Sequence, residues 1–304
     1  MDIPVPILIV GTGALATLFA ARLCAAGETV AMLGTWRAGL EALQREGARL
    51  VNAEGIEKTF RLHATDDPSE CQRARFALVL VKSWQTERAA AQLAECLATD
   101  GLAVTLQNGL GNREILAQTL GLPRVALGVT TTGATLLAPG LARAGGEGVI
   151  SIESHPRLSP LDEKLRAAGF TVHVVEDAQS LLWGKLVINA AINPLTALLH
   201  VPNGELLNRL AARSLMRDLA SEAAAVAAAQ GVKLPFGDPA AAAEQVAQRT
   251  GSNRSSMLQD VERGAPTEID AICGAILRAG EAYGVPTPIT QVCWRLVKAL
   301  SSAT

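Results

Sequence analysis

The residues best suited to chemistry lie in segment 183–194, which reads Trp-Gly-Lys-Leu-Val-Ile-Asn-Ala-Ala-Ile-Asn-Pro. One ammonium group and two amides, those of Lys185, Asn189 and Asn193, stand four residues apart in an otherwise apolar run. Residues four apart differ by only about 40° around a helix, so the three side chains share one face. Because polar groups are costly to bury without partners, we expect this face to bind a polar ligand.

Lys185 is the candidate proton donor of that face. A hydride delivered to a ketone leaves an alkoxide, and a lysine whose pKa lies near neutral pH could protonate it. Most lysines instead extend their ammonium group into solvent along an apolar stem. The neighbours of Lys185 argue against that alternative, since they leave little polar surface on the helix apart from the stripe with Asn189 and Asn193.

Two later segments add polar side chains to this half of the chain. Segment 251–259 is rich in hydroxyls and amides before a helix, and Asn253 and Ser256 could bind a substrate carboxylate or simply cap that helix. Thr267 with Asp270 matches a capping box. Glu268, between them, could accept a hydrogen bond from a substrate hydroxyl or keep Lys185 charged.

The chain begins with a pattern typical of dinucleotide binding. An apolar run, 7–10, leads into Gly11, Thr12, Gly13, Ala14, Leu15 and Ala16. The first glycine permits a tight turn, the second lets a pyrophosphate approach the backbone, and Ala16 stands where a third glycine is usual. The alternative is a tight turn that binds nothing. The following helix would offer its N-terminus to the phosphates.

Three further positions are candidates for cofactor binding. An NAD enzyme needs an acid at the tip of its second strand, but this chain has Gly-Thr-Trp-Arg at 34–37. Arg37 suits the 2′-phosphate of NADPH, although it could equally serve a helix turn on the surface. Lys82 and Asn108 follow other strands, at the edge where open α/β sheets bind ligands; each could instead be a surface charge or a turn residue.

The two halves of the chain differ in their hydrophobic patterns, which predict an α/β domain over 1–176 and an all-α domain over 177–304. In the first, strands alternate with helices, as in a parallel sheet covered on both faces. We expect strands at 5–10, 29–33, 76–81, 102–106, 125–129, 130–135, 149–153 and 171–175, with a small hairpin over 52–63. Helices fit at 14–26, 38–46, 85–97, 113–120 and 160–168. The second half predicts helices at 178–199, 206–230, 239–249, 256–263, 267–283 and 288–300.

Composition excludes several classes of protein. A formal charge of −2 over 304 residues gives no electrostatic basis for binding nucleic acid or anionic membranes. We expect no membrane span, because polar residues interrupt every apolar run before about 18 residues. Five scattered cysteines and four distant histidines predict reduced thiols, as in a cytoplasmic protein, and no metal site. The N-terminal segment lacks a basic region and leads directly into glycines, so we expect a buried strand there and no signal peptide. The Ala- and Leu-rich helices suit a homodimer face as well as internal packing.

Six segments resemble motifs of the ketopantoate reductase family and occur in the same order along the chain: 11–16, 81–85, 107–111, 183–197, 255–260 and 267–270. The resemblance implies a Rossmann-type dinucleotide-binding domain followed by a helical domain, an active site in a cleft, and NADPH-dependent reduction of 2-dehydropantoate to pantoate in pantothenate synthesis. The sequence departs from the family pattern at Ala16 and at the tip of the second strand, where Gly-Thr-Trp-Arg at 34–37 replaces the usual arginine.

By the same resemblance, Lys185 would be the general acid and Glu268 would lie near the cofactor and the substrate hydroxyl. Substrate would be bound by Asn189, Asn193, Ser256 and Asn253, and Lys82 and Asn108 would lie near nicotinamide and substrate. Two alternatives stay open. One is a reductase of a different 2-keto acid on the same two-domain plan, and the other is a dinucleotide sensor without catalytic activity.

Overall fold

The computed structural model describes residues 7–52 and 54–301 and divides the chain into two units. The first comprises residues up to Gln107 together with Asn112–Ala178, and the second comprises Asn108–Gly111 together with the residues from Gln179 onward. Each unit has its own hydrophobic core. The α/β fold followed by a helical half is as predicted from the alternation of strand and helix patterns.

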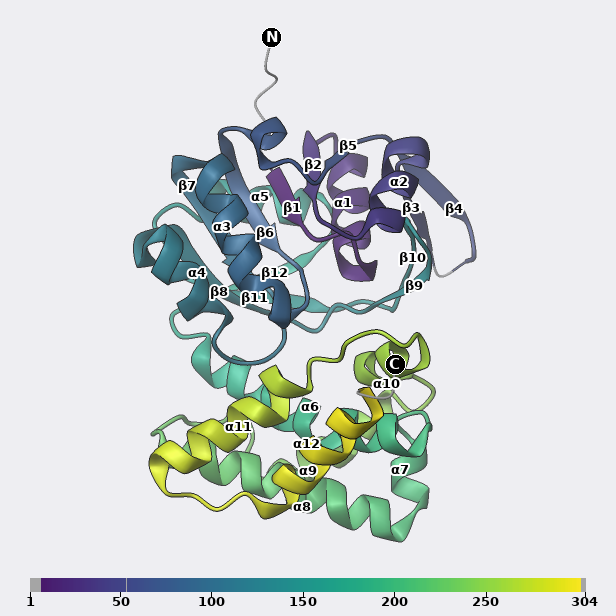
Figure 1. Ribbon diagram of the computed structural model, residues 1–304, viewed down its shortest axis with the longest axis vertical. Helices are drawn as coiled ribbons and strands as arrows, with labels where there is room; N and C mark the ends of the chain where they lie inside the picture. Colours follow the sequence, from purple (N-terminus) through teal and green to yellow (C-terminus); the bar gives the residue numbers. More distant parts are fainter. Residues whose placement is uncertain (1–6, 53, 302–304) are drawn as a thin grey trace. The chain divides into compact units, whose positions relative to one another are not determined.

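The first unit is built on an eight-stranded sheet of order β12-β11-β8-β7-β6-β1-β2-β5 (Figure 1). Its strands are β1 (Ile7–Val10), β2 (Val30–Leu33), β5 (His63–Thr65), β6 (Ala74–Val79), β7 (Leu97–Thr105), β8 (Val125–Thr130), β11 (Val149–Glu153) and β12 (Thr171–Val175). The strands from β8 to β5 are all parallel. Their carboxyl ends therefore lie at one edge of the sheet, where ligands bind in open α/β folds.

Helices cover both faces of this sheet, as the apolar strands predict. They are α1 (Ala14–Ala25), α2 (Arg37–Glu46), α3 (Thr86–Cys96), α4 (Asn112–Leu120) and α5 (Ser159–Ala167). In β1, Ile7 and Ile9 pack into one core with α1 residues, whereas Leu8 and Val10 pack into the core beneath α3 and α4. Alternate residues of a strand face opposite sides, so both faces are buried.

A second, four-stranded sheet of order β4-β3-β10-β9 was not predicted. It comprises β3 (Ala48–Val51), β4 (Glu57–Phe60), β9 (Ala134–Ala138) and β10 (Leu141–Ala144). All four strands contact α1, whose residues 16–21 are entirely buried. This explains why α1 is apolar all round: one side packs on the large sheet and the other on the small one.

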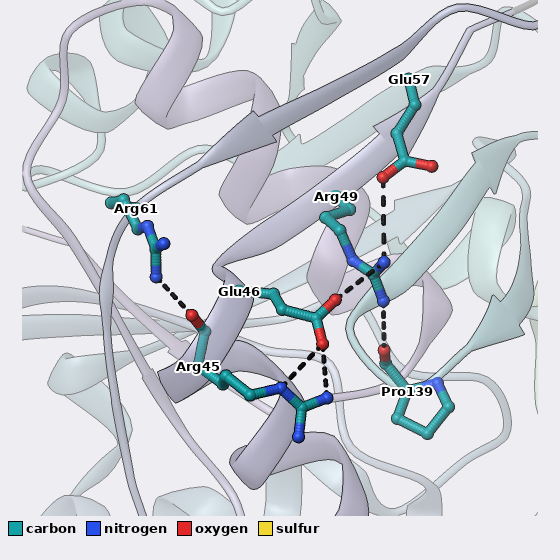
Figure 2. A network of polar contacts seen from close by, with 6 residues as sticks. All are labelled: Arg45, Glu46, Arg49, Glu57, Arg61 and Pro139. Atoms are coloured by element: carbon teal, nitrogen blue, oxygen red, sulfur yellow. Dashed lines mark hydrogen bonds and ion pairs between the residues drawn. The ribbon is translucent and has the colours of Figure 1, made fainter.

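A polar network joins α2 to the small sheet (Figure 2). Arg49 on β3 pairs with Glu46 at 2.8 Å and donates to the carbonyl of Pro139, in the β9–β10 turn, at 3.2 Å. Glu46 also accepts from Arg45, whose own carbonyl accepts from Arg61 at 2.5 Å. The network holds the C-terminal end of α2, and so helps to fix the helix that begins at the tip of β2.

Three details of the first half differ from the predictions. The hairpin is β3–β4, so it begins at Ala48 and not at 52, and His63–Thr65 belongs to the large sheet. No continuous strand covers 130–135, because β8 ends at Thr130 and β9 begins in the other sheet at Ala134. Strand β11 is antiparallel to β8. The chain between them forms the β9–β10 hairpin of the small sheet and not the helical crossover that a parallel pair needs.

The second unit consists of helices around the 21-residue helix α6 (Gln179–Leu199). The others are α7 (Glu205–Asn208), α8 (Leu210–Ala229), α9 (Pro239–Arg249), α10 (Ser256–Glu262), α11 (Ile269–Tyr283) and α12 (Pro288–Ser301). The helix expected over 206–230 is interrupted at Arg209, which has an extended backbone. Helix α6 contacts each of the other six, so it forms the centre of this core.

Helix α6 also corrects the expectation that no apolar run is long enough to span a membrane. By length and composition it qualifies, and it is the one such helix among the described residues. However, 72% of its most apolar window is buried inside the protein. Its apolar character is explained by its place in the core of the second unit.

Candidate active site

The glycine loop of the first unit has the geometry that a pyrophosphate requires. Gly11 has φ +131°, and a Cβ there would lie 3.1 Å from the carbonyl of Leu80, so a larger residue would be strained. Gly13 is exposed, and a Cβ there would meet nothing within 4 Å. The N-cap residue of α1 is Gly13, which has no side chain to cap the helix, so its first N–H groups can face an anion. The residues present therefore fit a dinucleotide.

The tip of β2 lies beside this loop. A Cβ on Gly34 would be 2.7 Å from the methyl group of Thr12, so glycine is needed for the two segments to meet. Arg37 begins α2 with its side chain 91% exposed, and pairs with Glu41 at 2.9 Å. An exposed pair of this kind contributes only about 0–1 kcal/mol. Arg37 can therefore exchange Glu41 for a ligand phosphate, so both roles considered for it remain compatible with the structure.

Lys82 follows β6 and is half-buried, directly before the short 3₁₀ helix Ser83–Gln85. It lies at the carboxyl edge of the large sheet, three residues after the strand ends. This is the position expected of a residue that contacts the cofactor or the substrate.

In the second unit, Lys185 and Asn189 are half-buried on α6, and Asn193 is buried. Desolvation by burial lowers the pKa of Lys185 to about 8, and the charge of Glu268 acts in the opposite direction. An ammonium group of this acidity can give up a proton near neutral pH. The apolar neighbours of Lys185 thus produce the property that a general acid needs.

Glu268 connects Lys185 to the segment after β7. It is 5% exposed, and its Oε2 accepts a hydrogen bond of 3.1 Å from Nδ2 of Asn108. Gly109, with φ +85°, lies so close to Ala271 that a Cβ would be 2.4 Å from the Ala271 carbonyl oxygen. The Asn-Gly pair therefore does more than form a turn: it seats segment 108–111 against the start of α11.

The capping box expected at Thr267 and Asp270 is wrong. Helix α11 begins at Ile269, so Glu268 itself occupies the N-cap position, without a side-chain capping bond. Asp270 accepts hydrogen bonds from Trp294 at 2.7 Å and Lys298 at 2.9 Å. The Asp270 carboxylate is therefore bonded to α12.

The other end of the polar face meets the start of α10. Thr196 Oγ1 lies 3.0 Å from the carbonyl of Asn193 and 2.7 Å from Ser255 Oγ. Ser255 Oγ accepts from the N–H of Leu258 at 3.1 Å, which makes Ser255 the capping residue. Ser256, one residue later, is exposed on the first turn and remains a candidate for substrate binding.

Asn203 is a buried polar residue that no sequence pattern indicated. It is 8% exposed, its N–H donates to the carbonyl of Asn253 at 3.0 Å, and its Nδ2 donates to Thr250 at 2.8 Å. Its buried Oδ1 has no hydrogen-bond partner in the described structure. In the sequence the Pro-Asn-Gly context of Asn203 indicated only a helix break, so nothing distinguished it. Asn253 itself is exposed.

Comparison with known proteins identifies the family. Residues 7–157 match the family model "Ketopantoate reductase PanE/ApbA", and residues 177–301 match "Ketopantoate reductase PanE/ApbA C terminal". The chain belongs to the ketopantoate reductase family.

Its relatives extend over nearly the whole chain. The 2-dehydropantoate 2-reductase of Archaeoglobus fulgidus is 38% identical and aligns over 97% of each chain. The crystal structure of a PanE/ApbA family ketopantoate reductase from Ralstonia eutropha JMP134 has 33% identity and a TM-score of 0.91, covering 97% of this chain and 98% of that one. The ternary structure of D-mandelate dehydrogenase with NADH and anilino(oxo)acetate has 25% identity and a TM-score of 0.92, over 98% of each chain.

This member of the ketopantoate reductase family is therefore an oxidoreductase that uses a nicotinamide dinucleotide. Its first unit carries the glycine loop, Arg37 and Lys82, and its second carries Lys185, Glu268 and the amides of α6. Among the described residues no group of three or more His, Cys, Asp or Glu side chains could hold a metal ion.

Proposed function

We propose that this chain catalyses the NADPH-dependent reduction of 2-dehydropantoate to pantoate, a step of pantothenate biosynthesis. The observation that carries this proposal is Lys185, half-buried on α6 with its pKa lowered to about 8 beside Glu268. Family membership and full-length relatives named 2-dehydropantoate 2-reductase support the choice of substrate.

In the proposed reaction, a bound NADPH supplies the hydride to the keto carbon. Lys185 Nζ donates a proton to the carbonyl oxygen as negative charge develops there. Glu268 helps to keep Lys185 protonated before the reaction, and Asn108 donates a hydrogen bond to the Glu268 carboxylate. Asn189, Asn193 and Ser256, with Asn253, are the candidates for hydrogen bonds to the substrate carboxylate and hydroxyl.

The preference for NADPH rests on the tip of β2. Segment 34–37 has no acidic residue for a ribose hydroxyl, and the exposed guanidinium of Arg37 suits a 2′-phosphate. Equal kcat/KM for NADH and NADPH would contradict this assignment. Arg37→Ala should raise KM for NADPH and leave KM for NADH nearly unchanged.

The deciding assay follows NADPH oxidation by the purified protein with 2-dehydropantoate. We expect turnover with saturation kinetics, and a loss of about 10²–10⁴-fold in kcat for Lys185→Ala, the usual contribution of a general acid. Binding of NADPH by Lys185→Ala should be retained, which shows that the variant is folded. Near-normal turnover by Lys185→Ala would refute the role of Lys185.

A second candidate function is reduction of a different 2-keto acid. It is favoured by the similarity to D-mandelate dehydrogenase, a structure determined with NADH. A panel of 2-keto acids that includes 2-dehydropantoate and the keto acid of mandelate, each with NADPH and NADH, separates the two by kcat/KM. Tight NADPH binding without turnover of any keto acid would instead indicate a sensor.

A further inference from the structure

A buried hydroxyl, that of Thr86, joins three loops at the carboxyl edge of the large sheet. Thr86 is the first residue of α3 and is fully buried. Its Oγ1 accepts a hydrogen bond of 2.9 Å from Nε2 of Gln107 and lies 2.8 Å both from the Ser83 carbonyl oxygen and from Oδ1 of Asn112. A hydroxyl carries one hydrogen, so it donates to one of these two acceptors at a time.

Gln107 extends this network and uses its whole amide group. Its second Nε2 hydrogen goes to the carbonyl of Val81 at 3.1 Å, and its Oε1 accepts from Thr105 Oγ1 at 3.0 Å. The side chains of Thr86, Thr105, Gln107 and Asn112 are all buried. A buried hydrogen-bond network of this kind resists displacement, because moving one member leaves a buried polar group without its partner.

The ends of this network coincide with segments that carry candidate site residues. Gln107 and Asn112 belong to the first unit and immediately flank segment 108–111, which belongs to the second. Within that segment, Asn108 donates to Glu268, and the N–H of Leu110 donates to the carbonyl of Ala271 at 3.2 Å. Val81 and Ser83, in turn, flank Lys82 on both sides.

We propose that Thr86 is a positioning residue of the reaction: its hydroxyl fixes both ends of segment 108–111 and thereby holds the Asn108 amide on Glu268. The inference rests on the proposed function, because it gives Asn108 and Glu268 a role in turnover. Thr86 is fully buried, so we expect it to act through these neighbours. A side chain misplaced by about 1 Å can cost up to 10²-fold in rate, so a hydroxyl that contacts only neighbouring residues can still affect turnover.

The test compares Thr86→Val, which keeps the shape and removes the hydroxyl, with Thr86→Ser, which keeps the hydroxyl. We expect Thr86→Val to lower kcat/KM for 2-dehydropantoate about 10-fold and Thr86→Ser to remain within about 3-fold of the wild type. Thr65→Val is the matched control, since Thr65 is 4% exposed in the same unit and its hydroxyl accepts only from the N–H of Asp67 in the described structure. It should leave kcat/KM unchanged.

A double-mutant cycle with Asn108→Ala distinguishes positioning from stability. If Thr86 acts through Asn108, Thr86→Val should cost less than about 2-fold in kcat/KM when Asn108 is already alanine. Additive losses, or a lowered Tm with unchanged kcat/KM, would overturn the proposal. Should Thr86→Val fail to fold, Asn112→Ala removes another arm of the network and should show the same coupling to Asn108→Ala.

Hydrogen exchange separates failure of this inference from failure of the proposed function. If the wild type turns over no keto acid, the proposed function fails, but the network can still be measured. Amides of segment 108–111 should then exchange faster in Thr86→Val than in Thr86→Ser, with Thr65→Val like the wild type. Equal exchange in all three variants would refute the positioning role.

Discussion

The acidity of Lys185 predicts how the reaction depends on pH. With a pKa of about 8, Lys185 is protonated to roughly 90% at pH 7 and roughly 10% at pH 9. Because only the protonated amine can act as the acid, kcat/KM for the keto acid should fall about tenfold between these two values. A lysine at its ordinary value of 10.5 would give no fall below about pH 10.

The measurement is kcat/KM for 2-dehydropantoate at saturating NADPH from pH 6 to 10, followed by NADPH oxidation. This parameter reports the groups that titrate in the enzyme before it binds the keto acid. Lys185→Arg is the matched control, since a guanidinium stays charged over the whole range. It should lose most of the rate and, with it, the alkaline fall.

Glu268→Gln tests the same pKa of Lys185 in a second way. The Glu268 carboxylate raises the pKa of Lys185 against desolvation, so its removal should move the alkaline fall to a pH below 8. A profile that stays flat to pH 9.5 would refute the reasoning. So would an unchanged fall in Lys185→Arg, because another group would then be titrating.

Three further predictions concern binding and stability. Gly13→Ala should weaken NADPH binding about tenfold or more, measured by NADPH titration, with little change in the free energy of unfolding, measured by urea denaturation. Gly11→Ala should instead lower the free energy of unfolding, because Gly11 has φ +131°. Ser255→Ala should lower the free energy of unfolding by about 1 kcal/mol through the lost cap, while Ser256→Ala should raise KM for the keto acid with unchanged stability. Lys185→Met should be more stable than the wild type at pH 7 by up to about 3 kcal/mol, since 10.5 − 8 is 2.5 pKa units. Because the folded state binds fewer protons between pH 8 and 10.5, this difference should shrink as the pH rises through that window.

Local patterns were sufficient to predict most elements of the fold. Apolar strands separated by helices predicted a sheet buried on both faces, and the glycine loop was placed correctly between β1 and α1. The small sheet could not be predicted, because β3 pairs with β10, about 90 residues further along the chain. The antiparallel direction of β11 depends on the same excursion into the second sheet, so no local pattern indicates it.

The candidate site shows the same division between local and long-range information. The common face of Lys185, Asn189 and Asn193 follows from helical periodicity alone. The contact between Asn108 and Glu268 joins residues 160 positions apart and has no local signature. The start of α10 at Ser256 was predicted correctly, but several residues of 251–256 could cap a helix, so the pattern did not single out Ser255.

Helix α6 links the stability of the second unit to the chemistry proposed for it. Trp183, Leu186 and Val187 are almost completely buried, and these contacts fix the rotation of the helix about its axis. A turn by one residue, about 100°, would bury Lys185 in that core or move it away from Glu268. Since desolvation is the larger cause of the lowered pKa, the packing that stabilises α6 also sets the acidity of Lys185. Substitutions that loosen α6 should therefore change the pH profile before they unfold the protein.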